Sequence, residues 1–197
     1  MGAMYPFEIH LTTDVPPAEL PNFVAACEQL RAKPLVIELA RGTHPIQPML
    51  SKVVHAPDLT AALAAAAADA KYLRACHLPP TRTKLETPTN YAFLATPANG
   101  PAFAPYFEWH SKVPYQHAEA LVALCRQHQV HLSTNALRGE SATRFVTLRE
   151  LGAVATFQAR VAGLVAALQP QWPLLKQESE CCLYDSNRML DAGWLTR

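Results

Sequence analysis

The segments "YPFEIHLTTD" (Tyr5–Asp14) and "YFEWHSKVPY" (Tyr106–Tyr115) share one pattern. Each alternates apolar and polar residues, and each carries a glutamate and a histidine two positions apart. Successive side chains of a β-strand point to opposite faces, so residues two positions apart share a face. We therefore predict two equivalent strands, each with one apolar face and one face that carries a Glu-x-His pair: Glu8 with His10, and Glu108 with His110.

Shorter matches follow these two segments in the same order along the chain. They indicate an internal duplication, because ordered matches are far less common than isolated ones. The matched pairs are "FVAACEQL" (Phe23–Leu30) with "LVALCRQH" (Leu121–His128), "LARG" (Leu39–Gly42) with "ALRG" (Ala136–Gly139), and Lys84-x-Glu86 with Lys176-x-Glu178.

Each half is predicted to run strand, helix, strand, strand, helix, strand, which is the order of a ferredoxin-like unit. The predicted fold class is α+β, a tandem duplication of two ferredoxin-like (βαββαβ) halves with a pseudo-twofold polar cleft. Residues 4–87 form the first repeat, residues 88–105 a Pro-rich linker, and residues 106–197 the second repeat with a C-terminal arm. Asp58 is the predicted N-cap of a helix, and Asp185 and Asp191 in the arm are expected to serve turns.

The predicted elements have these approximate ranges. Strands are expected at Phe7–Thr13, Pro34–Ala40, Gln47–His55, Cys76–Glu86, Tyr106–Val113, Val130–Asn135, Thr143–Leu148 and Leu174–Cys182. Helices are expected at Pro17–Arg31, Asp58–Leu73, His117–Gln129 and Leu151–Leu168.

The apolar strand faces are expected to pack on the helices, which leaves the Glu-His faces open. Two open faces covered on one side only would pack together or merge into one curved sheet, giving a cleft or partial barrel lined with charge. The alternative is a pair of solvated sheet faces with ion pairs across strands, as is common in antiparallel sheets.

Three chemical interpretations fit such a site. In the first, Glu8, His10, Glu108 and His110 surround one divalent metal ion, a ligand set that suits Zn, Mn, Fe or Ni. In the second, several cations converge on a phosphate or carboxylate, and Glu86, Glu178 or Glu180 holds a metal or acts as a general base. The candidate cations are Arg41, Lys52, Arg82, Lys84, Lys112, Arg138, Arg144, Arg149 and Lys176. Four of them, Arg82, Lys84, Lys112 and Lys176, are the predicted ligand-binding cations. In a catalytic version, His10 and His110 serve as acid, base or metal ligand, and Glu8 and Glu108 orient or ligate.

The third interpretation compares "HLTT" (His10–Thr13) and "HLST" (His131–Thr134) with the paired His-x-Thr/Ser motifs of two-histidine phosphoesterases. The two strings fall on non-equivalent strands of the repeat, which counts against that family. The mixed charge also resembles triphosphate tunnel enzymes. Their opening Glu-x-Glu-x-Lys is here Glu8-x-His10-x-Thr12 and Glu108-x-His110-x-Lys112, so we assign the chain to neither family.

Composition limits the function classes. A net charge of +1 and a pI near 7.7 do not indicate the basic surface that nucleic-acid-binding domains usually carry. The longest apolar run, Leu59–Ala68, is too short to span a bilayer. Five cysteines without a regular framework predict free thiols and a cytoplasmic location.

The predicted function is binding, and in its catalytic form hydrolysis, of a small anionic ligand in the polar cleft, with Glu178 among the ligand-binding residues and a divalent metal as the suggested cofactor. The alternative is a non-catalytic protein-interaction module with an apolar patch near Tyr106, Trp109 and Tyr115. The sequence leaves open whether the protein is an enzyme, which ligand it takes, and its oligomeric state.

Overall fold

The computed structural model describes residues 2–95, 104–139 and 141–194. The predicted strands and helices are confirmed, with bounds shifted by a few residues. The first half contains β1 (Tyr5–Thr13), α1 (Leu20–Gln29), β2 (Lys33–Leu39), β3 (Ile46–Ala56), α2 (Leu59–Ala75) and β4 (Pro80–Pro88). The second half contains β5 (Tyr106–Pro114), α3 (Ala118–Gln127), β6 (His131–Asn135), β7 (Thr143–Glu150), α4 (Val154–Leu168) and β8 (Lys176–Asp185).

Short 3-10 helices complete the described chain: η1 (Pro17–Glu19), η2 (Thr89–Leu94), η4 (Ala136–Arg138) and η5 (Arg188–Asp191). The predicted linker falls partly on η2, where Tyr91 and Phe93 both make edge-to-face contacts with Tyr5 at 5.7 Å between ring centroids. Residues 96–103 of that linker and residues 195–197 of the predicted arm lie outside the described residues. Among the described helices, none combines the length and apolar content needed to cross a membrane.

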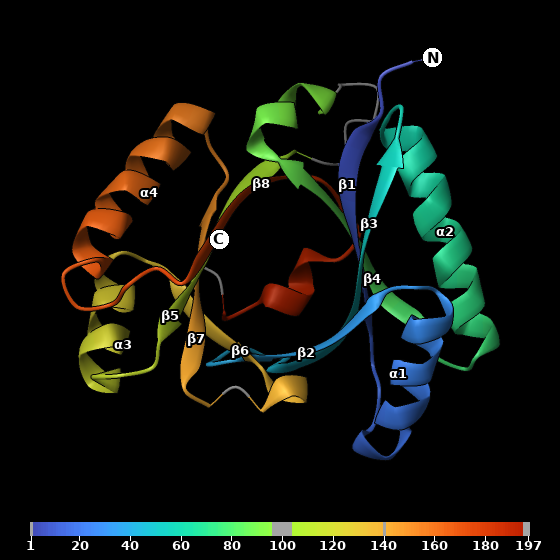
Figure 1. Ribbon diagram of the computed structural model, residues 1–197, viewed down its shortest axis with the longest axis horizontal. Helices are drawn as coiled ribbons and strands as arrows, with labels where there is room; N and C mark the ends of the chain where they lie inside the picture. Colours follow the sequence, from blue (N-terminus) through green and yellow to red (C-terminus); the bar gives the residue numbers. More distant parts are fainter. Residues whose placement is uncertain (1, 96–103, 140, 195–197) are drawn as a thin grey trace.

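All eight strands join in one closed antiparallel barrel, in the order β1-β3-β2-β6-β7-β5-β8-β4. Figure 1 shows the ring of strands, with α1 and α2 outside it on one side and α3 and α4 outside it on the other. Two seams connect the halves. At one seam β2 pairs with β6, from Ile37 opposite Asn135 to Leu39 opposite Ser133. At the other, β4 pairs with β8.

The predicted arrangement of two ferredoxin-like halves separated by a pseudo-twofold cleft is therefore wrong. The strands form a single closed barrel, and the polar faces line its interior instead of a cleft between two units. An open sheet leaves a row of unpaired N–H and C=O groups on each edge strand, and closure of the barrel pairs them. Side-chain alternation reports which face a residue takes, but it carries no signal for which backbone edges meet.

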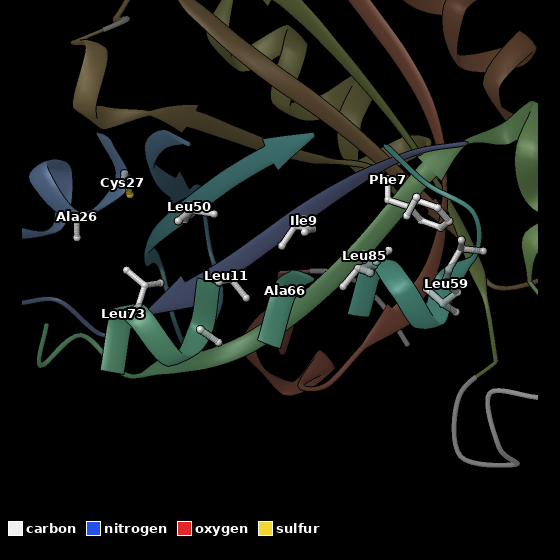
Figure 2. Packing of buried hydrophobic residues seen from close by; sticks show 14 of the residues in the cluster. Phe7, Ile9, Leu11, Ala26, Cys27, Leu50, Leu59, Ala66, Leu73 and Leu85 are labelled. Atoms are coloured by element: carbon white, nitrogen blue, oxygen red, sulfur yellow. The ribbon is translucent and has the colours of Figure 1, made fainter. Parts of the chain in front are cut away.

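The predicted facing of the strands is confirmed. Phe7, Ile9 and Leu11 of β1 are fully buried in a cluster with residues of α1 and α2, including Leu73, and Figure 2 shows this layer between strand and helix. Trp109 of β5 is buried in a second cluster with residues of α3 and α4. The apolar side chains thus point outward beneath the helices, which leaves Glu8, His10 and their counterparts pointing into the barrel.

A C-terminal arm enters the barrel after β8, and Figure 1 shows η5 inside the ring of strands. Trp194 is buried against Leu39 and Ile37 of β2, and its indole N–H donates to the Leu132 carbonyl at 3.2 Å. Gly42 makes room for this contact: it has φ +122°, and a Cβ on it would lie 3.1 Å from the Trp194 Cβ. Any side chain at residue 42 would therefore strain its own backbone and push the arm outward.

Asp58 caps α2 as predicted, with its Oδ1 accepting from the Ala61 N–H at 2.8 Å. We expect Asp58→Ala to lower the free energy of unfolding by about 1 kcal/mol, since it leaves a first-turn N–H without its partner. Urea unfolding would measure this loss. Asp58→Ser, which keeps an accepting oxygen, serves as the control. Equal stability of wild type and Asp58→Ala would contradict the capping role.

Candidate functional site inside the barrel

The polar side chains of the strands surround a cavity of about 350 Å³ in the barrel interior. This volume is at the small end of the range for pockets that bind small molecules. Every residue predicted to be catalytic, ligand-binding or metal-binding lines the cavity: Glu8, His10, Arg82, Lys84, Glu108, His110, Lys112, Lys176 and Glu178. The structure thus brings together residues that are far apart along the chain. Their hydrogen-bond and ion-pair partners determine which of them are available to bind a ligand.

Arg82 of β4 is the centre of one ion-pair network. Its guanidinium donates to both carboxylate oxygens of Asp185, at 2.8 and 2.5 Å, and to both oxygens of Asp191, at 3.0 and 2.9 Å. The Tyr106 hydroxyl donates to Asp185 at 2.8 Å. Burial opposes charge on Asp185, but the hydrogen bonds and charge of Arg82 outweigh it and lower the pKa of that carboxyl. Bidentate pairing on two sides leaves Arg82 little capacity for a ligand.

Glu108 connects this network to the neighbouring strands. It accepts from Arg149 at 2.6 Å and from the Lys84 ammonium at 2.5 Å, and Arg149 also donates to Asp191 at 2.7 Å. Burial raises the pKa of Glu108, but the positive charges of Arg149 and Lys84 more than offset burial and hold that pKa well below its ordinary value.

These pairings bear on the predicted anion site, because Arg82, Lys84 and Lys176 already have carboxylate partners. Lys84 also lies 2.7 Å from Glu86, and Lys176 pairs with Glu178 at 2.8 Å in an exposed position. The Lys112 ammonium lies 5.9 Å from the centre of the Phe145 ring. The linked ion-pair networks join six carboxylates with three permanent cations, and Lys33, Lys112 and Lys176 line the cavity outside these networks. The carboxylates are Glu8, Glu86, Glu108, Glu180, Asp185 and Asp191, and the cations are Arg82, Lys84 and Arg149.

His10 lies between two of these carboxylates. Its Nε2 is 3.0 Å from Glu86 and 3.7 Å from Glu8, and Glu8 also accepts from the Ser51 hydroxyl at 2.6 Å. Burial lowers the pKa of His10, but the hydrogen bond and charge of Glu86 outweigh burial and leave that pKa raised. The other ring nitrogen, Nδ1, is buried and has no hydrogen-bond partner in the described part of the chain.

His110 has polar neighbours at both of its ring nitrogens. Its Nδ1 lies 3.0 Å from the Thr147 hydroxyl, and its Nε2 lies 3.3 Å from Glu108 and 3.8 Å from Glu180. Burial lowers the pKa of His110, but the hydrogen bond to Glu108 leaves it raised. For Glu180, burial and the nearby charge of Glu86 raise the pKa to about 7.

The acid-rich part of the interior contains one candidate metal centre among the described residues. Glu86 of β4, His110 of β5 and Glu180 of β8 each offer a ligand atom, and these atoms lie within 4.8 Å of one another. The predicted set of Glu8, His10, Glu108 and His110 does not form this centre, because β1 and β5 are separated in the ring by β4 and β8. Only His110 belongs to both sets. Glu86 and Glu180 were candidates for holding a metal in the anion interpretation.

Asp185 and Asp191 are the interior residues whose ion pairs sequence reasoning did not predict. Both aspartates were expected to serve turns. Asp185 does so, since its Oδ1 accepts from the Asn187 N–H at 3.1 Å, and both aspartates are also buried partners of Arg82. The one available signal was the apolar Trp194 beside Asp191, since an acid in a segment that packs inward needs a cation. No local pattern identifies Arg82 as that cation.

His131 of the second "HLST" string lies away from the metal candidate. Its Nδ1 accepts from Arg41 at 2.9 Å, and its ring is 5.7 Å from that of Trp194. Burial, together with the charges of Arg41 and Arg149, lowers the pKa of His131 to about 4. His131 is therefore a neutral packing residue that accepts from Arg41, and it does not pair with His10.

We expect Asp191→Asn to lower the free energy of unfolding by about 3 kcal/mol, because it leaves Arg82 and Arg149 buried with an incomplete set of partners. Urea unfolding would measure the loss, and Asp14→Asn, the same change at an exposed aspartate, is the matched control. If Asp191→Asn and Asp14→Asn lowered the free energy of unfolding by equal amounts, Asp191 would not be the link between Arg82 and Arg149.

The depressed pKa of His131 predicts a pH dependence. The folded pKa of about 4 lies below the unfolded value of about 6.5, so the unfolded chain takes up the proton first and stability falls as pH drops from 6.5 towards 4. In His131→Asn, the loss of stability between pH 7 and pH 4.5 should be smaller than in wild type by about 2 kcal/mol. His77→Asn controls for loss of a histidine. Identical pH profiles for wild type and His131→Asn would contradict the assignment.

Comparison with known proteins leaves the family unassigned. No protein-family model matches the chain, and no curated protein matches its sequence. A candidate monooxygenase from Lactobacillus acidophilus has 8% identity and a TM-score of 0.36, with 98% of this chain and 100% of that chain covered. A haem-binding protein from Thermus thermophilus has 13% identity and a TM-score of 0.29, with 91% of each chain covered. A chlorite dismutase mutant from Candidatus Nitrospira defluvii has 12% identity and a TM-score of 0.30, with coverages of 94% and 92%. Similarity at this level indicates neither a shared family nor a shared ligand.

Proposed function

We propose that the protein binds a divalent transition-metal ion inside the barrel, with Glu86, His110 and Glu180 as ligands, and that this ion holds a small molecule in the adjoining cavity. The observation that carries the proposal is the convergence of these three side chains from three adjacent strands, with their ligand atoms within 4.8 Å of one another. They converge within ion-pair networks whose carboxylates outnumber their permanent cations, and a divalent cation would offset that excess.

The distances suit a first-row divalent ion. Bonds of about 2.0–2.2 Å in tetrahedral geometry separate ligand atoms by roughly 3.3–3.6 Å, so small side-chain rotations would bring this group to bonding positions. One imidazole and two carboxylates suit Zn, Mn or Fe. Three protein ligands also leave at least one coordination position for water or substrate, as in catalytic zinc sites.

Neighbouring side chains orient the proposed ligands. Thr147 lies 3.0 Å from Nδ1 of His110, which leaves Nε2 facing the carboxylates. His10 holds one oxygen of Glu86 at 3.0 Å. The other, Glu86 Oε1, lies 2.7 Å from the Lys84 ammonium but outside hydrogen-bond geometry, so it has a charged neighbour without a hydrogen bond. Partners that fix ligand orientation in this way are a regular feature of metal sites.

The small molecule is proposed to be anionic, and the metal is what would hold its charged group. Arg82 and Lys84 already have carboxylate partners, so an anion gains little from them directly. A divalent ion lowers the pKa of bound water and polarises a bound oxygen, so hydrolysis is the reaction that we propose for a catalytic form of the site.

The alternative of a protein-interaction module would be favoured by an exposed apolar patch near Tyr106, Trp109 and Tyr115. Tyr106 and Trp109 are buried, and Tyr115 packs under the Arg144 guanidinium at 3.9 Å. Those three residues therefore offer no apolar patch to a partner, and we favour the metal site.

Isothermal titration of chelator-stripped protein with ZnCl₂ and MnCl₂ tests the proposal. We expect one equivalent to bind to wild type. In Glu180→Gln, affinity should fall by at least about tenfold, because the change keeps the shape of a ligand but removes its charge. Glu178→Gln, on the same strand but exposed and paired with Lys176, is the matched control.

Two results would contradict the proposal. The first is no binding of either metal to wild type. The second is equal weakening by Glu178→Gln and Glu180→Gln, which would indicate general attraction to an acidic surface in place of coordination.

A further inference from the structure

We infer that the molecule held in the barrel has an apolar body beside its metal-binding group. This inference rests on the proposed function, because it assumes that the metal centre fixes one end of the ligand. It is carried by the difference between the two walls of the cavity: the residues that line one wall are all charged or histidine, and the apolar strand residues that line the cavity all lie on the other wall.

Ring order places the two walls opposite each other. In a closed barrel of eight strands, β2 and β8 are four positions apart in either direction. Glu180 of β8 therefore faces across the interior towards β2, where Leu35 and Ile37 line the cavity. Strands β1, β4, β5 and β8 form the charged wall. Strands β2, β3, β6 and β7 form the mixed wall, where apolar side chains alternate with polar ones and with Lys33 and Arg149.

Several apolar side chains of the mixed wall line the cavity, and two of them, Leu35 and Met49, lie opposite each other on neighbouring strands. Leu35 of β2, Met49 of β3 and Phe145 of β7 line the cavity and are only half-buried. None of them belongs to the three hydrophobic clusters of the described residues. Their exposed surface is turned into the barrel, where a ligand could cover it. Burial of such surface is favourable roughly in proportion to its area.

The C-terminal arm limits the space on this wall. Trp194 packs on Leu39 at one end of β2, and Asp191 links Arg82 with Arg149 beside it. The remaining volume of about 350 Å³ corresponds to roughly ten water molecules at the density of the liquid. It suits a small aromatic or branched aliphatic body joined to an oxygen-donor head, such as a carboxylate or hydroxamate.

Two hydroxamates test this inference with the metal-loaded protein. Acetohydroxamate and benzohydroxamate carry the same chelating head, but only the second has an aromatic body. Their dissociation constants would be measured by titration of Co²⁺-loaded protein, following the cobalt absorption bands. Wild type should bind benzohydroxamate roughly tenfold or more tightly than acetohydroxamate, since the ring covers the apolar side chains of the mixed wall.

A pair of variants distinguishes the contribution of the apolar side chains to ligand affinity from that of the chelating head group. Leu35→Ser should reduce the ratio of the two dissociation constants at least about threefold and leave Co²⁺ affinity unchanged, because it removes apolar surface but no ligand. Leu151→Ser makes the same change at an exposed residue that does not line the cavity, and it should keep the wild-type ratio. Any intrinsic difference between the two hydroxamates cancels in this comparison.

The outcomes distinguish the two proposals. If Co²⁺ binds and the ratio is the same in wild type and Leu35→Ser, the apolar body is refuted while metal binding stands. If Co²⁺ does not bind to wild type, the proposed function fails and this inference fails with it.

Discussion

The structure depends on the pairing of charges inside a closed barrel. Closure joins the edges of neighbouring strands, but it also encloses the polar faces of the strands, so their charges lose most of their water. Such charges are tolerated only when they are paired and hydrogen-bonded. Arg82, Arg149 and Lys84 provide this pairing at one end of the interior, and Asp191, which the C-terminal arm carries into the ring, completes it.

The same pairing explains why the remaining interior is suited to a cation. Once those three cations are matched, carboxylates are left over, and they gather around the two histidines. His10 and His110 offset part of that charge only when protonated, and both have raised pKa values because carboxylates surround them. A divalent ion would do so at any pH at which its ligands are deprotonated. The apolar side chains on the wall across from Glu180 then give the cavity two chemically distinct sides.

Sequence reasoning predicted the faces of the strands but not the closure of the barrel. Alternation in β1 and β5 placed Glu8, His10, Glu108 and His110 on the polar face, and all four line the cavity. The ring order was out of reach, because it depends on backbone edges that side-chain patterns do not report. The predicted metal ligands were chosen by symmetry between β1 and β5. In the ring, β4 and β8 lie between those two strands, so the glutamates of these intervening strands, Glu86 and Glu180, lie beside His110.

The central claim is that Glu86, His110 and Glu180 bind one divalent ion. Anomalous diffraction from a crystal grown with Zn²⁺, recorded on both sides of the zinc absorption edge, tests it most directly. The account predicts a single strong peak inside the barrel, about 2.0–2.2 Å from one ligand atom of each of the three side chains. A barrel interior without a peak, or a peak held by other residues, would contradict it.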